Sequence, residues 1–534
     1  MAARPDKLWA TARDETLIRS LLRADAFPHP ARDIDLLETH ISWVVLAGDF
    51  AYKIKKPVRL AFLDFSTLEL RRRCCEEELR LNRRWAPQLY LSVVPITGTT
   101  EKPRVGGDGP AIEYAVRMVR FPQHAILAAE LEAGHLTQED MSEIAVMLAA
   151  RHGQTLQVRV AGEDAVRDVA EPMLENFEYL GDSLDADSYS ALKTWTEASL
   201  RTLDATLRQR AESGFVRECH GDLHLGNLVR LPSGIVAFDC IEFSEALRTI
   251  DVISDVAFLA MDLFAHGRSD LAYGFLNRYF ECTGDYGAAR VLPLYVVYHC
   301  LIRAKVLAIR SVERGEDAER RRDLDELHHY CDVAREWMST GVPALIITFG
   351  CSGSGKTWLS NRLMSSLPAI RVRSDIERRR LAGIGETARS GSGVGRGIYD
   401  PAMTRRTYDC LLQAARTVLE AGMNVILDAA FLERSERLRA RRLAAQSGAT
   451  FLILEASAPR DVLVERLRRR TLHGRDVSEA DAAVLEYQLA HAETPDGTES
   501  TQALRLDTSR QLDPAELAAR VREAIGRLHD GAKV

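Results

Sequence analysis

Two short segments carry side chains whose types and spacing could bind phosphate groups. The first, ECHGDLHLGNLVR at residues 218–230, places His220, Asp222 and Asn227 on one loop, and Asp239 ends the apolar run GIVAFD that follows. The second, TFGCSGSGKTWLS at residues 348–360, fits the pattern GxxxxGK[ST] in full. The first segment offers carboxylates and the second offers backbone donors, so the chain holds two unlike candidate sites.

Asp222, Asn227 and Asp239 have the side chains expected of a site for divalent cations. Two carboxylates held beside an amide are unfavourable unless cations neutralise them. Two Mg²⁺ ions bound to ATP would do so. In this interpretation Asp222 orients a substrate hydroxyl and accepts its proton, while Asn227 and Asp239 hold the metal ions. His220 by itself is better explained as a packed loop histidine, and we assign no role beyond structure to His224.

The second segment predicts a Walker A loop. Glycines let successive backbone N–H groups point at one anion, and the N-terminus of the next helix adds a favourable dipole. Lys356 would reach the β- and γ-phosphates of ATP, and the Thr357 hydroxyl would bind Mg²⁺. The residues predicted to bind the phosphates are those of the loop: Gly350, Ser352, Gly353, Ser354, Gly355, Lys356 and Thr357.

Further polar residues follow this loop at places where strands should end. Asp428 ends the apolar run NVILDAA, where an acid would help to hold Mg²⁺; an exposed aspartate at a strand end is the alternative. Asp375, in VRSDIERRR, would accept a proton from a substrate hydroxyl or cap a helix that starts at Ile376. The arginines of VERLRRRTLHGRD predict a lid over the phosphates or a solvated helix face: Arg466, Arg469, Arg470 and Arg475.

The elements that must position these residues differ between the two halves. Residues 34–56 predict strands near 34–39, 41–47 and 50–56, with a hairpin turn at Gly48-Asp49. Ser66 would cap a charged helix, with Glu69 as its capping-box partner. Strands near 90–96 and 111–118 come next, then mostly helical patterns from 137 to about 338, interrupted by a strand at 234–239.

From residue 344 onward, strands and helices alternate, which indicates a parallel sheet. Strands are predicted at 344–350, 424–430 and 450–456, and helices at 356–366, 404–421, 433–446, 459–470 and 478–490. The predicted fold class is therefore an α+β, two-lobed domain at 1–339, followed by an α/β P-loop NTPase domain with a parallel sheet at 340–534.

The C-terminal part resembles the small P-loop kinases of the zeta-toxin, polynucleotide-kinase and gluconate-kinase group. The P-loop, Ser374-Asp375, the strand VILDAAF and the arginine-rich run carry this resemblance. It implies phosphoryl transfer from ATP to a hydroxyl group of a small or nucleotide-like substrate.

The N-terminal part resembles the aminoglycoside phosphotransferase and choline kinase branch of the protein-kinase-like fold, through HGDxxxxN and the aspartate of FDC. The resemblance implies an N-lobe at about 1–120 and a C-lobe at about 121–339. It also implies a strand lysine on the phosphates, held by a helix acid. The strand FAYKIKK offers Lys53 and Lys55 on one face, and Lys53 is preferred because it lies deeper. We prefer Glu78 as the helix acid and place Glu77 second.

Two features of this resemblance stay open. Met118, at the end of a predicted strand, would lie in a hinge beside adenine, although apolar residues at strand ends are usually core. The segment ETHISW lacks the glycines of a protein-kinase phosphate loop, which leaves Ser42 or backbone amides to cover the phosphates.

Composition agrees with a cytoplasmic kinase. The 534 residues carry a net charge of −7 and nine scattered cysteines, and no run of about 18 apolar residues suggests a membrane span. Nucleic acid is an improbable partner on this charge, although a nucleotide-like substrate fits. The whole chain resembles bacterial fusions of an aminoglycoside phosphotransferase-like domain with an AAA-type or zeta-like kinase. It predicts a two-site kinase that uses ATP and Mg²⁺ on small-molecule hydroxyls. The alternative is an ATP-gated regulatory protein in which one domain only senses or hydrolyses ATP.

Overall fold

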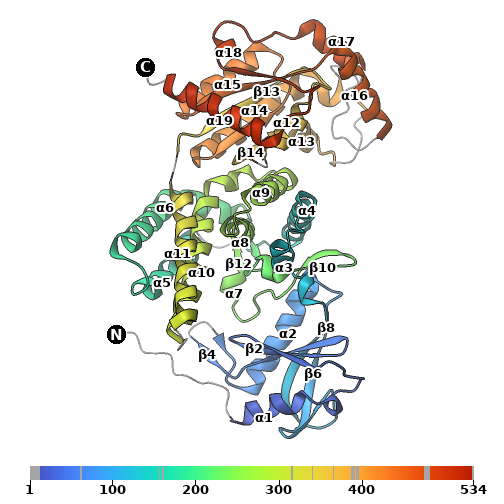
Figure 1. Cartoon of the computed structure of the whole chain (residues 1–534), viewed down its shortest axis with the longest axis vertical. Coiled ribbons are helices and arrows are strands. Elements are labelled where there is room, and N and C mark those ends of the chain that lie inside the picture. Colours follow the sequence, from blue (N-terminus) through green and yellow to red (C-terminus); the bar gives the residue numbers. More distant parts are fainter. Residues whose placement is uncertain are drawn as a thin grey trace. The chain divides into compact units, whose positions relative to one another are not determined.

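The computed structural model describes residues 12–60, 63–155, 157–158, 162–313, 317–339, 341–364, 366–385, 391–392, 396–473 and 482–531 (Figure 1). The chain forms two compact units. Unit 1 comprises Met1–Leu136, Ala150–Asp168 and Gln209–Leu259, and unit 2 comprises Thr137–Ala149, Val169–Arg208 and Ala260–Val534. Each unit contains one of the two candidate sites.

Unit 1 is built on a six-stranded antiparallel sheet with the order β1-β2-β3-β8-β6-β7 (Figure 1). Its strands are β1 (Asp35–Glu38), β2 (Ser42–Ala47), β3 (Phe50–Lys55), β6 (Tyr90–Thr99), β7 (Lys102–Val105) and β8 (Ala111–Val119). The predicted hairpin turn lies between β2 and β3, with Gly48 at φ +58°. A side chain there would meet the carbonyl oxygen of Pro30 at 2.8 Å, so glycine is required. Strand β7 was not predicted.

The helix α2 (Leu68–Trp85) packs against β6 and β8. Thr67, not Ser66, is its N-cap, because the Thr67 hydroxyl accepts the Leu70 N–H at 3.2 Å. Ser66 bonds to Asp64 instead, and Glu69 pairs with two arginines of the helix. The predicted capping box was therefore wrong: a carboxylate just before the helix competes for the serine hydroxyl.

The alternation of side chains along the strands gives this sheet an apolar cluster on each face. One cluster centres on Val45, Tyr52 and Ile54. The other includes Ala51 and Val116 and continues to Val229 of β10 (Leu228–Leu231), which pairs with β11 (Gly234–Ala237). This second cluster brings the end of β11, and with it Asp239, to strand β3.

The remaining elements of residues 12–313 are mostly helices, which agrees with the prediction from residue 137 onward; those of the remaining helices that precede residue 137 were not predicted. They are α1 (Ala12–Leu21), α3 (Leu127–Glu132), α4 (Gln138–Gln154), α5 (Gly162–Leu180), α6 (Ala186–Glu212), α7 (Glu245–Arg248), α8 (Val252–Ala265), α9 (Ser269–Thr283) and α10 (Leu292–Glu313), with short strands β4 (Arg59–Leu60), β5 (Leu63–Asp64), β9 (Val216–Glu218) and β12 (Thr249–Asp251). Helix α11 (Asp317–Met338) follows. In α10, residues 292–312 are long and apolar enough to cross a bilayer, although charged residues interrupt them and they form no continuous apolar run. Of their most apolar 18-residue stretch, 61% is buried, as in a core helix.

The predicted parallel sheet lies in unit 2, with the order β14-β15-β13-β16-β17. Its strands are β13 (Ala344–Phe349), β14 (Ala369–Arg373), β15 (Asn424–Asp428), β16 (Thr450–Ser457) and β17 (Ala503–Asp507). The helices are α12 (Lys356–Met364), α13 (Ser374–Leu381), α14 (Pro401–Glu420), α15 (Arg434–Gln446), α16 (Arg460–His473), α17 (Ala482–His491), α18 (Thr498–Thr501) and α19 (Pro514–Gly531). Strand β17 and helix α19 were not predicted.

A buried ion pair fixes the segment that follows β15. Arg437 of α15 and Glu499 of α18 are both buried and joined by two hydrogen bonds of 3.1 and 2.8 Å. Arg437 also donates to the carbonyl oxygens of Phe431 and Leu432. Phe431 has φ +46°, so this arginine holds an unfavourable backbone conformation close to Asp428.

We therefore predict that Glu499→Gln lowers the free energy of unfolding of this region by about 3–5 kcal/mol, because it leaves a buried guanidinium without its counter-charge. Urea denaturation followed by circular dichroism measures the change. The matched control is Glu486→Gln, which breaks the exposed Arg460–Glu486 pair and should cost less than about 1 kcal/mol. Equal effects of the two substitutions would contradict this account of the buried pair.

Candidate functional site

The centre of unit 1 is a cluster of two lysines and three carboxylates, of which all but Asp239 are buried. Lys53 Nζ lies 3.0 Å from Glu78 Oε1 and forms an ion pair with Asp239. Lys55 Nζ lies 2.5 Å from Glu78 Oε2 and forms an ion pair with Glu242. Glu78 therefore bridges both lysines of β3. With all five groups ionised, the cluster has one negative charge in excess.

Sequence reasoning chose Lys53 and Glu78, and the structure brings these two together. Glu77, the second choice, instead pairs with Arg80 and Arg248. Lys55 is not a solvated edge lysine: its side chain is 0% exposed. The shared face with Lys53 was a signal for Lys55, but nothing in the local sequence indicated that Glu242 would neutralise it.

The segment after β11 is held so that Asp239 faces Lys53. Asp239 has φ +64°, a conformation that is unfavourable for any residue but glycine, asparagine or aspartate. Its N–H donates to the Tyr90 hydroxyl at 3.0 Å, and the next N–H, of Cys240, donates to Asn82 Oδ1 at 2.9 Å. Asn82 lies one turn after Glu78 on α2, so one helix positions both the acid and the aspartate.

Electrostatics keep this cluster charged. Burial alone would lower the pKa of Lys53, but Asp239 and Glu78 outweigh it and hold the pKa well above its ordinary value. Burial would raise the pKa of Asp239, and Lys53 instead holds it below its ordinary value. Burial raises the pKa of Glu242 in spite of its contact with Lys55. Asp239 is therefore ionised at neutral pH and is able to bind a cation.

The loop after β9 brings Asp222 and Asn227 together. Asn227 Nδ2 donates to both Asp222 Oδ2 and the Asp222 carbonyl oxygen, each at 2.9 Å. His224, to which sequence reasoning gave no role, places its Nε2 3.6 Å from Asp222 Oδ2. The side chains of Asp222 and Asp239 are each 40% exposed. The Asp222 carboxylate opposes part of the lowering of the Asp239 pKa by Lys53, so the two acids lie within electrostatic range of each other.

His220 belongs to the framework of this loop. Its ring is buried edge-on against Trp85, and its Nε2 lies 2.9 Å from the Phe238 carbonyl oxygen. Its Nδ1 lies 3.4 Å from the Asp222 N–H. Both contacts are satisfied if Nε2 carries the proton and Nδ1 accepts. Burial lowers the pKa of His220, which favours this neutral form.

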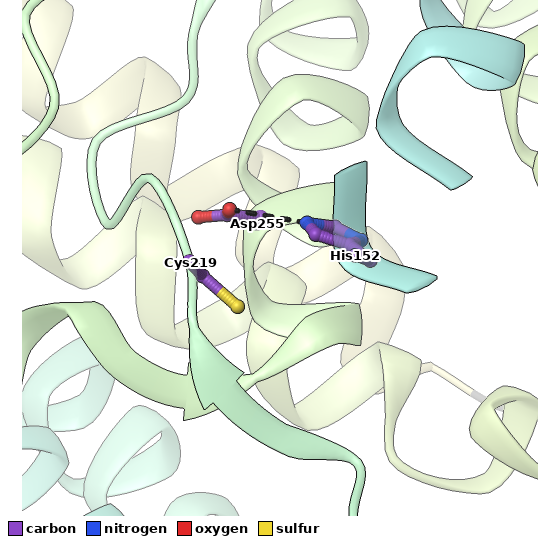
Figure 2. Close-up of side chains that lie close together, drawn as sticks. All are labelled: His152, Cys219 and Asp255. Atoms are coloured by element: carbon purple, nitrogen blue, oxygen red, sulfur yellow. Dashed lines mark hydrogen bonds and ion pairs between the residues drawn. The ribbon is translucent and has the colours of Figure 1, made fainter. Parts of the chain in front are cut away.

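Asp255 of α8 holds the same loop through hydrogen bonds to two of its backbone N–H groups. Its Oδ2 accepts the His220 N–H at 2.7 Å and its Oδ1 accepts the Gly221 N–H at 2.9 Å. His152 Nε2 lies 3.3 Å from Oδ2, and Cys219 lies close to both side chains (Figure 2). This His, Cys and Asp group could in principle hold a metal ion. However, burial holds the pKa of the Cys219 thiol well above its ordinary value, and hydrogen bonds occupy both oxygens of Asp255. We read the group as a structural brace.

Two other sequence candidates in unit 1 are buried. Met118 packs in the apolar cluster with Val229, as a core residue does. Ser42 is fully buried opposite Lys55, and among the described residues its hydroxyl has no hydrogen-bond partner. Glu242 and Asp251 lie on different elements, because Glu242 follows β11 whereas Asp251 ends β12 and pairs with Arg210.

In unit 2 the loop after β13 forms the cradle that the Walker A pattern requires. Gly350 and Gly355 have φ +147° and +93°, which favour glycine. A side chain at Gly350 would meet the Ala456 carbonyl oxygen at 2.5 Å. Gly353 also has a positive φ, and a side chain there would meet a backbone oxygen at 2.9 Å. The glycines thus let the backbone curl back on itself at the start of α12.

The other residues of the P-loop form hydrogen bonds within the loop or to a helix outside it. Lys356 Nζ donates to the carbonyl oxygens of Gly350 and Cys351 at 2.9 and 3.0 Å, so its ammonium lies at the loop. The Ser352 N–H donates to the side-chain oxygen of Gln488 on α17 at 2.7 Å. Ser354 turns inward: its N–H bonds to Cys351, and its hydroxyl is buried. Sequence reasoning did not find Gln488, which lies far along the chain in a helix of ordinary composition.

Arg466 of α16 forms hydrogen bonds to the P-loop backbone and to Thr508. Its guanidinium donates to the Gly353 carbonyl oxygen at 3.1 Å and to both the hydroxyl and the carbonyl of Thr508. Thr508 in turn donates to the Ser354 carbonyl oxygen at 2.6 Å. Arg469 is exposed and pairs with Glu465. The arginine lid stays a prediction, because Arg475 and the side chain of Arg470 lie outside the described residues.

The acids predicted in this domain gather at one edge of the parallel sheet. Asp428 ends β15, is 5% exposed and accepts the Ser360 hydroxyl at 3.0 Å. It is therefore not an exposed strand-end aspartate. Ser360 lies one turn after Thr357 on α12, so this bond ties Asp428 to the helix that the P-loop begins. Asp375 is the second residue of α13 and not its cap, since Arg373 is the N-cap residue.

Both sites fit a magnesium nucleotide on observations of the structure itself. In unit 1 a negative excess remains beside two half-exposed aspartates, and a divalent cation would neutralise it. In unit 2 the glycines of the loop leave no room for a Cβ atom. The Ser352 N–H donates to an acceptor outside the loop, the side-chain oxygen of Gln488. Asn227 and Asp239 would hold metal in unit 1, and Thr357 and Asp428 would do so in unit 2.

Comparisons with known proteins cover both halves. A family model described as "Phosphotransferase enzyme family" matches residues 75–292, and one described as "AAA domain" matches residues 345–495. Three relatives, from Mycobacterium bovis and two strains of Mycobacterium tuberculosis, are each named an uncharacterized protein. Each is 31% identical over 474 residues, which is 87% of this chain and 93% of the relative.

Solved structures show partial likenesses. A putative kinase from Chloroflexus aurantiacus is 25% identical, covering 34% of this chain and 99% of its own, with a TM-score of 0.29. A Plasmodium vivax ethanolamine kinase is 11% identical, covering 57% of this chain and 84% of its own, with a TM-score of 0.36. The two family models confirm the resemblances found in the sequence: a protein-kinase-like phosphotransferase fold followed by a P-loop domain.

The brace formed by Asp255 leads to a prediction about stability. Asp255→Ala leaves the His220 and Gly221 N–H groups without their acceptor, and each buried unsatisfied group costs about 1–3 kcal/mol. We expect the free energy of unfolding to fall by about 2–5 kcal/mol at pH 7. Asp270→Ala, which removes a partly exposed partner of Arg268, is the control and should cost less than about 1 kcal/mol.

The pH dependence of the difference in unfolding free energy between wild type and Asp255→Ala provides a second measurement. Burial opposes the charge on Asp255, but hydrogen bonds and the charge of His152 keep its pKa below the ordinary value. A lowered folded-state pKa contributes stability above the unfolded pKa of about 3.9, and that contribution is lost as pH falls below it. The difference in unfolding free energy between wild type and Asp255→Ala should become smaller as pH falls from about 5 to about 3. A difference that is constant over this range would contradict the role of the charge.

Proposed function

We propose that this chain, which belongs to the same family as the three mycobacterial proteins and carries a phosphotransferase match before its P-loop match, is a kinase with two ATP sites. Each site would transfer the γ-phosphoryl group of ATP to a hydroxyl of a small-molecule or nucleotide-like substrate. The observation that carries the proposal is the convergence in unit 1 of Asp222, Asn227 and Asp239 beside the Lys53–Glu78 ion pair.

In the first site the residues have separate tasks. A bound magnesium–ATP complex supplies the phosphoryl group. Lys53, which Glu78 holds in place, binds the phosphates, and Asn227 with Asp239 binds the metal. Asp222 is partly exposed and oriented by Asn227, so it is placed to accept the proton of a substrate hydroxyl.

In the second site the backbone of the P-loop binds the phosphates and Lys356 neutralises their charge. Thr357 and Asp428 hold the metal. Asp375 lies just past the end of β14, the strand next to β15, and the carboxyl ends of parallel strands share one edge of a sheet. Asp375 therefore fits the acceptor of the proton from the second substrate.

A second candidate function has one observation in its favour. The side-chain oxygen of Gln488 accepts the Ser352 N–H, so a residue of the protein itself occupies one backbone donor of the loop. A domain that binds and hydrolyses ATP without transferring it would need only the loop and its metal ligands. In that case the P-loop domain would be a sensor of ATP, and the first site alone would be a kinase.

The test is transfer of labelled phosphate from γ-labelled ATP to a panel of hydroxyl compounds by the full chain. Asp222→Asn should reduce one group of labelled products by about 10²–10⁴-fold, because it removes the proton acceptor and keeps the shape. Lys356→Ala should abolish a different group, and the exposed control Asp182→Asn should change neither. Loss of the same products in both variants would argue against two sites, and hydrolysis that depends on Lys356 without any product would favour the sensor.

A further inference from the structure

Helix α9 contacts strand β14 of the parallel sheet through two buried side chains, Asn277 and Glu281. Both α9 and β14 belong to unit 2. Strand β14 is the edge strand of the parallel sheet, so one side of its backbone has no strand neighbour. Asn277 takes that place: its Nδ2 donates to the Ala369 carbonyl oxygen at 3.0 Å, and its Oδ1 accepts the Arg371 N–H at 2.5 Å. An amide side chain thereby pairs with the strand as another backbone would.

One turn further along α9, Glu281 enters the same region. It is buried, and its Oε1 accepts both Nε and Nη2 of Arg371 at 3.1 and 2.7 Å. Its Oε2 lies 3.9 Å from Arg373 and 3.8 Å from Arg278. Glu281 is thus the counter-charge of two arginines at the end of β14.

The same two arginines approach Asp428 from the other side. Arg371 Nη1 lies 3.2 Å from the Ser360 hydroxyl, which donates to Asp428 Oδ2 at 3.0 Å. Arg373 Nε lies 3.8 Å from the same oxygen, and Arg373 stands opposite Asp428 in the strand register. Arg371 and Arg373 therefore lie between two acids, Glu281 and the predicted metal ligand Asp428, and Arg278 is a third base beside Glu281.

We propose that Glu281 is a positioning residue for the P-loop site, because it holds Arg371 and Arg373 away from full pairing with Asp428. This inference rests on the proposed binding of a magnesium nucleotide by the P-loop. Without the Glu281 charge, Arg371 and Arg373 lose one of the acids that they contact, and Asp428 stays beside them. They would turn to Asp428 and compete with Mg²⁺ for its oxygens. Residues that hold metal ligands typically change metal affinity by about 10- to 100-fold when they are removed.

The experiment measures binding of a fluorescent ATP analogue by the full chain as Mg²⁺ is titrated. All proteins carry Asp239→Asn, so that the P-loop site dominates the signal, and adding Lys356→Ala defines the background. In Glu281→Gln, the Mg²⁺ concentration for half-maximal binding should rise about 10-fold or more. Binding without Mg²⁺ should change less than about 3-fold, since the loop itself is intact.

Two controls separate positioning from support of the fold. Asn277→Ala should lower the melting temperature and leave the Mg²⁺ dependence unchanged, because it removes no charge. Glu420→Gln, which breaks the ion pair with Arg290 in the same unit, should alter neither the Mg²⁺ dependence nor the binding without Mg²⁺. An equal shift in Asn277→Ala and Glu281→Gln would show that the effect is structural and would overturn the proposal.

The remaining outcomes of the Mg²⁺ titration also support or overturn the proposal. If Glu281→Gln does not fold, Arg373→Gln serves instead, because it removes a guanidinium that competes with Mg²⁺ for Asp428 and should lower the Mg²⁺ concentration for half-maximal binding. An unchanged Mg²⁺ dependence in the folded variant overturns the positioning role while the nucleotide site stands. If the parent protein binds no nucleotide above the Lys356→Ala background, the proposed function of the P-loop fails first and this inference fails with it.

Discussion

Two ammoniums and three carboxylates share the buried space between β3, α2 and the segment after β11, and charges in such a place must be neutralised by one another. Glu78 bridges both lysines, and Asp239 and Glu242 close the set. This requirement fixes the register of β3 against α2 and holds Asp239 in its unusual backbone conformation. The excess negative charge beside Asp222 then makes the cluster suitable for magnesium. The chemistry proposed for unit 1 follows from this balance.

Unit 2 meets the same electrostatic problem by a different route. Its anion site uses backbone N–H groups, and its one buried metal ligand, Asp428, is balanced by arginines that are themselves balanced by Glu281. In both units the aspartate that would bind metal is therefore set by neighbours that do not touch a substrate. The second network also includes a residue of α9, a helix that precedes the P-loop domain in sequence and falls within the phosphotransferase match.

The sequence predicted those parts of the fold and of the sites that depend on local pattern. The hairpin at Gly48-Asp49, the P-loop and the parallel order of β13, β15 and β16 rest on short-range signals of turn type, glycine spacing and apolar runs. It failed where a distant partner decides the outcome. Lys55 is buried because Glu242 neutralises it, and Thr67 caps α2 because Asp64 takes Ser66. Gln488, Arg466 and Glu281 lie in ordinary helices, so only the tertiary structure reveals their contacts.

The central claim is that one chain builds two separate pockets for a magnesium nucleotide. Its most direct test is the stoichiometry of a non-hydrolysable ATP analogue bound to the full chain with Mg²⁺, measured by equilibrium dialysis. The account predicts two nucleotides per chain, falling to one when either Lys53 or Lys356 is replaced by alanine and to none when both are. A single nucleotide per chain in the wild type, or a stoichiometry that neither substitution changes, would contradict it.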